Sequence, residues 1–178
     1  ISGISAFGGS VNNVDIKNPP ANAFSLYLDQ GCYTTVWTNC GFDGEAGRIK
    51  LQGVGTQPVT TQTFIGCLWA QMYADNCSSN SVINCIIQGD LTPKFVLSEQ
   101  YGLTISGSDM EGTGLLYQFG TNCGQVACVN NTLVGFSGTY STGEIGGGML
   151  LDQKYPVAAA GDNPLIINNQ AITTATIT

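Results

Sequence analysis

The apolar residues of the chain fall in short alternating segments that repeat along the sequence. In a first set, seen in "WTNCGF", "FIGCLW" and "NCIIQG", a small residue precedes a large apolar residue by two positions. The large residues are Phe42, Trp69, Ile87, Met110 and Leu133, and the small ones are Cys40, Cys67, Cys85, Ser108 and Asn131. Successive large residues are 27, 18, 23 and 23 positions apart. Self-similarity at such a period indicates a repeat architecture.

A second set of alternating segments lies between the members of the first. Its anchors are Leu28, Leu51, Tyr73, Leu97, Phe119 and Leu151. Period-2 alternation predicts short strands, and a period of about 23 residues with two or three strands fits one coil of a parallel β-solenoid. The Leu-x-x-Leu-x-Leu pattern of leucine-rich repeats is missing. We therefore predict an all-β fold, a right-handed single-stranded parallel β-helix, whose hand follows the general preference of parallel crossovers.

The repeat covers most of the chain but not its last part. We assign residues 1–135 to β-helix coils. In residues 136–178, glycine-rich and proline-containing inserts surround "MLLDQ", and we expect a loop-rich insert and terminal strands that continue the same domain. The chain opens at Ile1, without Met, in a segment that is already strand-like. We therefore expect a fragment of a longer protein.

Stacked coils place equivalent residues above one another, about 4.8 Å apart. The large and small residues of the first set should then form two neighbouring internal stacks, in which Cys packs as a small hydrophobe. In "SVINCIIQG" we expect Ile83, Cys85 and Ile87 to face inward, with Asn84 and Gln88 outward. Replacement of Cys85 by Ser or Ala should then cost little. A disulfide between neighbouring coils stays open, since the coil spacing lies near the lower end of the allowed Cα separation.

Composition narrows the functional classes. The chain is 43% hydrophobic but only 10% charged, and its net charge is −7 with five basic residues. This balance argues against nucleic acid and anionic membranes as partners, whereas glycans remain open. No apolar run reaches transmembrane length, so we expect no membrane insertion. With seven cysteines, no Cys-x-x-C and no His, a Cys-His nucleophile is excluded, and we expect no metal and no cofactor.

One stretch carries a family resemblance. "YGLTISGSDMEG" (101–112), preceded by "TQTFIGCLWA" and "NSVINCIIQG", resembles the coils of phage tailspikes and tail fibres of the pectin-lyase-like superfamily, over roughly residues 30–135. The resemblance implies a homotrimer on the virion tail that acts outside the cell in host attachment. Such proteins bind bacterial surface polysaccharide, either O-antigen or capsule, and many are depolymerases that cleave it. No catalytic motif of the family matches residue by residue.

Two acids are candidates for catalysis. Asp75 and Glu99 each follow a second-set anchor by two residues, which would make them neighbours in one column of adjacent coils. Glycosidases use two carboxylates about 5–5.5 Å apart for retention or about 6.5–9.5 Å for inversion. Adjacent coils provide the shorter separation. The alternative is a pair of solvated turn acids, and a lyase would instead need a base and a cation that neutralises a uronate.

Candidate glycan-binding residues flank the second-set anchors on the side that should face outward. They are Tyr27, Arg48, Lys50 and Lys94. Arg48 and Lys94 each lie three residues before an anchor and two coils apart, so they could form a sparse cationic strip for an acidic glycan. The alternative is ordinary solvated residues that discourage lateral aggregation.

Two other functions compete with a polysaccharide-binding tailspike segment. The first is a non-catalytic β-helix shaft or adhesin passenger with the same repeat. The second is a free-standing pectinase-like hydrolase or lyase, which should carry paired Asp residues, usually with His, in a longer chain. The absence of His counts against this second alternative.

Overall fold

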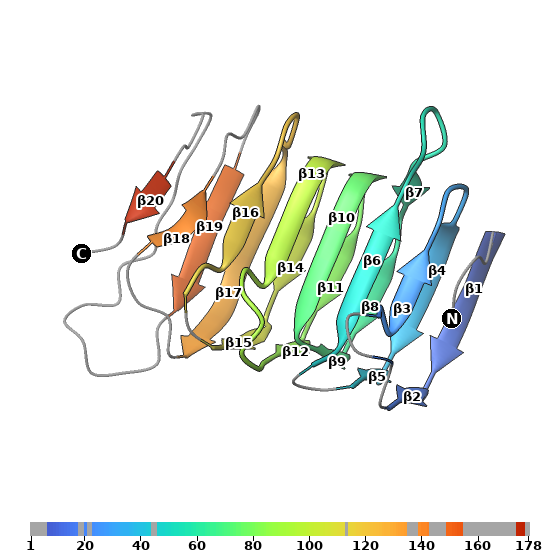
Figure 1. The fold of residues 1–178 in the computed structure, drawn as a ribbon, viewed down its shortest axis with the longest axis horizontal. Coiled ribbons are helices and arrows are strands. Elements are labelled where there is room, and N and C mark those ends of the chain that lie inside the picture. The colour runs from blue at the N-terminus through green and yellow to red at the C-terminus, as the bar shows by residue number, and fades with distance from the viewer. Residues whose placement is uncertain are drawn as a thin grey trace.

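The strands of the molecule stack along one axis into a rod of coils. In a computed structural model of the chain, the described residues are 7–17, 20, 23–43, 46–112, 114–134, 139–142, 149–154 and 174–176. They form β-strands and no helix, arranged as a parallel β-solenoid of about five turns with a spacing of about 23 residues. The first and last labelled strands lie at opposite ends of the long axis (Figure 1). The predicted all-β parallel solenoid is thus confirmed.

Three rows of parallel strands form the walls of the solenoid. Wall 1 contains β3 (Leu26–Leu28), β6 (Arg48–Gln52), β10 (Gln71–Ser78), β13 (Phe95–Tyr101), β16 (Tyr117–Phe119) and β18 (Thr139–Thr142). Wall 2 contains β1 (Phe7–Asn12), β4 (Tyr33–Thr38), β8 (Thr63–Ile65), β11 (Ser81–Ile83), β14 (Thr104–Ser106), β17 (Val126–Val134) and β19 (Met149–Lys154). Wall 3 contains β2 (Asp15–Ile16), β5 (Gly41–Phe42), β9 (Leu68–Trp69), β12 (Ile86–Ile87) and β15 (Asp109–Glu111), and the end of β17 continues it.

Two further strands depart from this scheme. The short β7 (Val59–Thr60) pairs with β10 at the end of wall 1, beyond a hairpin bridge between Val54 and Gln57. The last strand, β20 (Thr174–Thr176), pairs with β18 and is antiparallel to it. After residue 135 the described residues are 139–142, 149–154 and 174–176, so most of the expected loop-rich insert lies outside the described residues.

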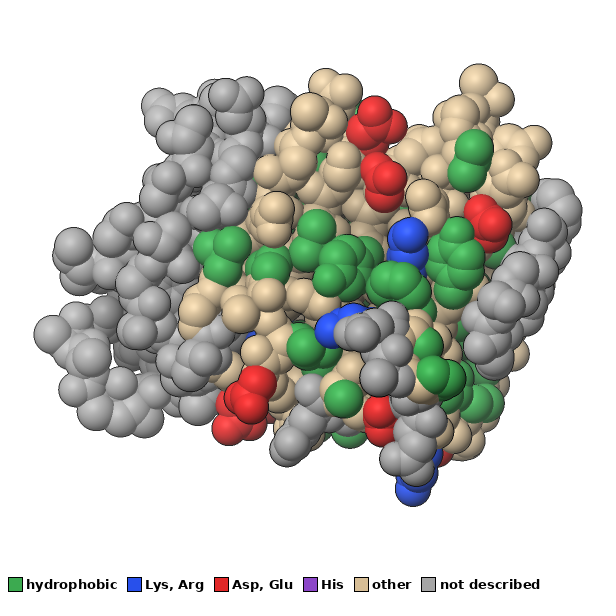
Figure 2. All heavy atoms as spheres, viewed as in Figure 1, with side chains coloured by type: hydrophobic (Ala, Val, Ile, Leu, Met, Phe, Trp, Pro, Cys, Tyr) green, Lys and Arg blue, Asp and Glu red, His purple; other side chains and the backbone are tan. Residues whose placement is uncertain are grey.

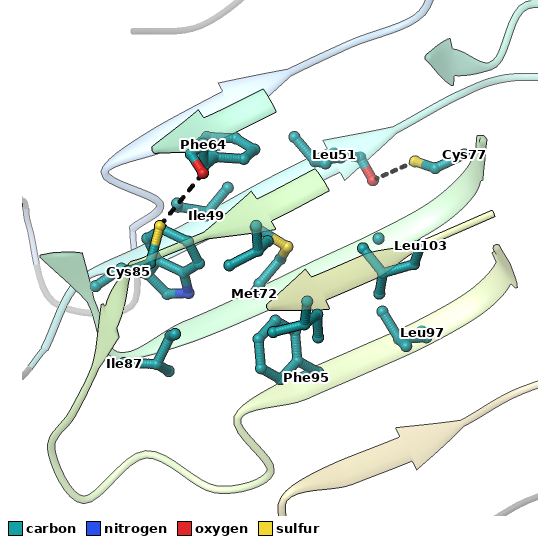
Figure 3. Packing of buried hydrophobic residues seen from close by; sticks show 14 of the residues in the cluster. Ile49, Leu51, Phe64, Met72, Cys77, Cys85, Ile87, Phe95, Leu97 and Leu103 are labelled. Carbon is teal, nitrogen blue, oxygen red and sulfur yellow. Dashed lines mark hydrogen bonds between the residues drawn. The ribbon is translucent and has the colours of Figure 1, made fainter. Parts of the chain in front are cut away.

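The first-set columns have the predicted register. In wall 3, Trp69 pairs with Ile87, Ile87 with Met110, and Met110 with Leu133. Every small residue from Cys40 to Asn131 is at most 1% exposed, and they follow one another in the same register. The interior is filled by like-on-like stacks, and Figure 3 shows side chains from several coils meeting there. This packing is the source of the hydrophobic stabilisation, at about 25 cal/mol per Å² of apolar surface buried.

The second-set anchors are partly wrong. Leu51 pairs with Ala74, and Ala74 pairs with Leu97, so Ala74 and not Tyr73 occupies the internal column. Tyr73 is half-buried on the outer side. Leu151 pairs with a residue of wall 2, Cys128, and so does not belong to wall 1. The predicted register of this coil was wrong by one residue, because Ala74 is too small to be recognised as an internal position beside a tyrosine.

Residues in the left-handed region form three columns along the rod, one between walls 2 and 3 and two between walls 1 and 2. Between walls 2 and 3 the same position is always Asn or Gly, with φ between 50° and 61°: Asn13, Asn39, Gly66, Asn84, Gly107 and Asn130. Wall 1 ends in a second such column, which contains Gly31, Asn76, Glu99 and Asn122. Wall 2 begins after a third column: Gly8, Thr34, Thr61, Ser79, Gly102 and Gln125. Asn and Gly suit the first column because they tolerate this conformation best.

Six of the seven cysteines come directly after one of these left-handed residues. At the corner between walls 2 and 3, the Cys85 thiol donates to the Ile83 carbonyl at 3.3 Å and to Phe64 of the preceding coil at 3.4 Å. At the end of wall 1, the Cys77 thiol makes the same pair of bonds, to Asp75 and Leu51. Figure 3 draws one bond from each thiol. The thiols therefore add a second, weak donor to carbonyls that already accept backbone N–H groups, as Ile83 does from Gly66 and Asp75 from Gly53.

The bend also corrects one sequence expectation. Ile83 is half-buried on the outer side, and Val82 is the buried residue of this strand. Strict alternation across Asn84 predicted the opposite, because it ignores the left-handed residue that resets which side faces inward. Cys85 and Ile87 do face inward, as predicted.

The corner between walls 2 and 3 gives a direct test. A Cβ on Gly107, at φ +60°, would lie 2.4 Å from Asn84 Oδ1, whereas a Cβ on Gly55, at φ +57°, would meet nothing within 4 Å. Gly55→Ala should therefore cost only the conformational penalty of about 1–2 kcal/mol. Gly107→Ala should cost more, and less when combined with Asn84→Gly, as measured by urea unfolding. Equal costs for Gly107→Ala in the two backgrounds would contradict the contact.

Candidate functional site

The two candidate catalytic acids do not share a register position. Asp75 pairs with Ser98 on wall 1, and Glu99 is the next residue, at the left-handed corner. The correction follows from the one-residue slip of the Tyr73 anchor. Asp75 is half-buried on β10, whereas Glu99 is exposed. The expected column of two neighbouring carboxylates is therefore wrong.

The predicted cationic strip is also changed. Arg48 and Lys94 do lie two coils apart in one register column. Gln71 of the coil between them pairs with Arg48, and the next pair, Met72 with Phe95, places Gln71 opposite Lys94. Lys94, however, is 0% exposed. Its Nζ donates to the Gly89 carbonyl. The prediction that Lys94 faces outward is therefore wrong.

The space around the Lys94 ammonium explains how it is accommodated. Gly112 lies against it, and a Cβ there would come within 2.8 Å of Lys94 Cε. Burial lowers the pKa of Lys94, while the charges of Asp90 and Glu111 act in the opposite direction. Lys94 thus serves as a buried hydrogen-bond donor within the connection between β12 and β13, and it packs against Gly112 of the next coil. Of the expected strip, only Arg48 is half-exposed.

Tyr27 and Lys50 lie together on the outer side of wall 1. Tyr27 pairs with Lys50, and Lys50 pairs with Tyr73 of the next coil. The Lys50 ammonium lies 5.4 Å from the ring centroids of both Phe24 and Tyr27, within the range of a cation–π contact. The Tyr27 hydroxyl donates to Gln52 at 3.0 Å. Burial and the charge of Asp29 raise the pKa of Tyr27. This cluster is satisfied largely by its own members.

A shallow hollow of about 360 Å³ opens at the end of wall 1. It is lined by Pro58, Asn76, Cys77, Ser78, Glu99, Tyr101 and Asn122. Three of these lining residues occupy the same corner position in three successive coils: Asn76, Glu99 and Asn122. Tyr101 is 45% exposed, one of the most exposed large apolar side chains among the described residues. The hollow combines an exposed ring with a carboxylate, two amides and a hydroxyl.

Neighbouring interactions hold this hollow in place. The Asn76 side chain donates to the Gly55 carbonyl at 3.0 Å, which fixes the hairpin that follows β6. Beneath the hollow, Gln100 is buried, donates to the Tyr101 carbonyl at 2.9 Å and accepts from Asn80. One flanking backbone is therefore held by an outer side chain and the other from inside, so the outer side chains are presented on a rigid frame.

Most of the hollow was missed by the sequence interpretation. Of its lining residues, only Glu99 was a candidate, and its expected partner Asp75 does not line it. A signal did exist: Asn directly before Cys, at Asn76 and Asn122, marks the corner column. Its geometric meaning depends on the left-handed conformation, which alternation does not reveal.

The cysteines pack inside the fold. All seven are buried and none is joined in a disulfide. Among the described residues, no group of three or more Cys, Asp, Glu or His side chains could hold a metal ion. Burial raises the pKa of Cys77 and that of Cys128 to about 12. Thiols this hard to ionise are poor nucleophiles and poor metal ligands.

Figure 2 shows one face of the rod, on which charged side chains are few and hydrophobic ones form a row along the long axis. Comparison of the chain with protein-family models, with curated proteins and with solved structures found no match. Within the described part of the chain, no helix is long and apolar enough to cross a membrane.

The raised thiol pKa predicts a pH dependence. Above pH 9, the ordinary value given for a thiol, Cys77 ionises in the unfolded chain but keeps its proton in the fold up to about pH 12. Stability should therefore be complete below pH 9 and fall by up to about 1.4 kcal/mol per pH unit above it for this group. Cys77→Val should flatten the fall in unfolding free energy between pH 8 and pH 10.5.

The substitution fits the fold because Val59 occupies the same position in the preceding coil. The remaining cysteines titrate equally in both proteins, so the difference between the two curves isolates Cys77. Parallel curves for the wild-type protein and the variant would contradict the assignment.

Proposed function

We propose that the chain is a segment of a phage tailspike and that the hollow at the end of wall 1 binds a bacterial surface polysaccharide. The observation that carries the proposal is the lining of this hollow, where exposed Tyr101 lies beside Glu99, Asn76, Asn122 and Ser78. The resemblance of residues 30–135 to tailspike coils supports the same function. It also supports a homotrimer located on the virion tail.

The lining matches the chemistry of a sugar. A pyranose offers an apolar face, which packs on an aromatic ring, and a rim of hydroxyls, which bond carboxylate, amide and hydroxyl groups. A volume of about 360 Å³ lies at the lower end of ligand-binding clefts, enough for a short stretch of glycan. Because the frame is rigid, little conformational entropy is lost when the glycan binds.

We propose binding rather than hydrolysis as the activity of this segment. Hydrolysis of a glycosidic bond uses two carboxylates that flank the bond. The hollow contains one of the two candidates, Glu99, while Asp75 pairs with Ser98 outside its lining. Release of new reducing ends that is lost in both Asp75→Asn and Glu99→Gln would revise this part of the proposal.

A non-catalytic shaft is the second candidate. It is favoured by the parallel pairing of successive strands in walls 2 and 3 and by the continuous stacks inside them, which suit a stiff spacer. A shaft requires no ligand in the hollow. The two candidates therefore differ in whether isolated chain binds polysaccharide.

Binding should depend on Tyr101. Tyr101→Ser places at this position the residue that Ser78 provides in the preceding coil, so the fold should tolerate it. Loss of the ring should weaken polysaccharide binding about tenfold or more. Titration calorimetry against purified O-antigen and capsule polysaccharides measures the change.

The matched control is Ile86→Ser, since Ile86 is also 45% exposed but lies on wall 3 away from the hollow. It should leave the affinity unchanged. Equal losses in both variants would contradict a site in the hollow, and no binding by the wild-type chain to any polysaccharide would favour the shaft. A monomeric mass in solution would count against the homotrimer.

A further inference from the structure

The charge of the hollow comes from one residue. Among its lining residues Glu99 is the only ionisable carboxylate, and none is Lys or Arg. The basic residues of the chain are engaged or placed elsewhere. Lys17 forms an ion pair with Asp15 at 3.0 Å, Lys50 lies against two aromatic rings, and Lys94 is buried.

The remaining two basic residues do not reach the lining either. Arg48 lies at the start of β6, whereas the hollow is at the opposite end of wall 1. Lys154 is the last residue of β19 and pairs with Thr132, in the end of β17 that continues wall 3. The hollow therefore presents a negative charge with no cation in its lining to offset it.

The backbone at Glu99 adds an independent observation. Its φ is +47°, and the residues at the same corner in the coils before and after are Asn76 at +50° and Asn122 at +55°. Asn tolerates this region several-fold better than Glu does. Left-handed residues other than Asn and Gly also occur at the entry to wall 2. At the end of wall 1, however, Glu99 is the exception among the described coils, and it is the residue with the charge.

We propose that Glu99 determines specificity and makes the hollow selective for sugar units that carry no carboxylate or phosphate. This inference rests on the proposed function, because it names the substrate class of the same site. The earlier expectation of an acidic glycan depended on an outward Lys94, and that residue is buried. The ligand chemistry is thus reversed from acidic to non-anionic.

The selectivity follows from elementary electrostatics. Sugar hydroxyls donate to the Glu99 carboxylate, and hydrogen bonds to a charged acceptor are stronger than neutral ones. An anionic sugar group in the same place would face a like charge and would lose its own hydration without a cation to replace it. Discrimination therefore arises from both attraction and repulsion at one side chain.

The test uses one polymer in two chemical forms. A uronate-containing capsule polysaccharide and its carboxyl-reduced form have the same linkages and differ only in charge. The wild-type chain should bind the reduced form about tenfold more tightly at low salt. Glu99→Asn, which places at this corner the residue found in both neighbouring coils, should bring the two affinities within about threefold of each other.

Two further measurements make the result specific. Glu99→Asn should raise the melting temperature while it weakens binding of the reduced polymer, because it relieves the backbone and removes the acceptor. Glu111→Gln removes an exposed acid on wall 3 and should leave the discrimination unchanged. Equal discrimination in Glu99→Asn and in the wild-type protein would overturn the inference.

The two proposals fail in different ways. If the wild-type chain binds the acidic parent more tightly than the reduced form, polysaccharide binding stands and the selectivity is overturned. If it binds neither this pair nor any polysaccharide of the O-antigen and capsule panel, the proposed function is overturned and the selectivity with it.

Discussion

The structure depends on a single requirement: every coil must return to the same register after three changes of direction. Parallel strands tolerate no slip, because a shift by one residue moves each side chain to the opposite side. The chain meets this requirement partly with columns of left-handed residues, one between walls 2 and 3 and two between walls 1 and 2. At the corner between walls 2 and 3 the left-handed residue is Asn or Gly in all six described coils.

The recurring cysteines are a consequence of these corners. After the left-handed residue the cysteine side chain turns inward, where its thiol lies close to the carbonyl two positions before it. That carbonyl also accepts a backbone N–H of the preceding coil, as Ile83 does from Gly66. A thiol is small enough for a narrow coil, apolar enough for its core and still a weak donor. Ser108 makes the same bond to Ser106 with its hydroxyl, at 3.2 Å. Asn131 instead donates to Ile105 of the preceding coil.

Large apolar residues were the part of the fold that the sequence could predict. The stack from Phe42 to Leu133 has the expected register because each of its large apolar residues follows a small residue by two positions, which fixes the phase of the strand. Prediction failed where size and exposure disagree. Ala74 is internal but small, and Tyr73 is large but external, so the predicted register was wrong by one residue. The prediction placed Asp75 opposite Glu99, whereas Asp75 pairs with Ser98.

The site was less predictable than the fold, for a related reason. A lysine in an apolar alternation is normally solvated, whereas here the Gly89 carbonyl accepts a bond from Lys94 and Gly112 of the next coil leaves room for its side chain. The hollow is built from corner residues of successive coils, Asn76 and Glu99 among them, whose side chains meet through the bend and not through alternation. The pattern of polar and apolar residues does not show which residues adopt left-handed backbone torsions.

The uneven repeat also has a mechanical meaning. Phe42 to Trp69 takes 27 residues and Trp69 to Ile87 takes 18, yet each interval is one step between paired strands. Both steps advance the chain by about 4.8 Å along the axis. Insertions therefore change the width of a coil and leave the length of the rod unchanged. The length of the rod depends on the number of coils and not on the number of residues in each coil.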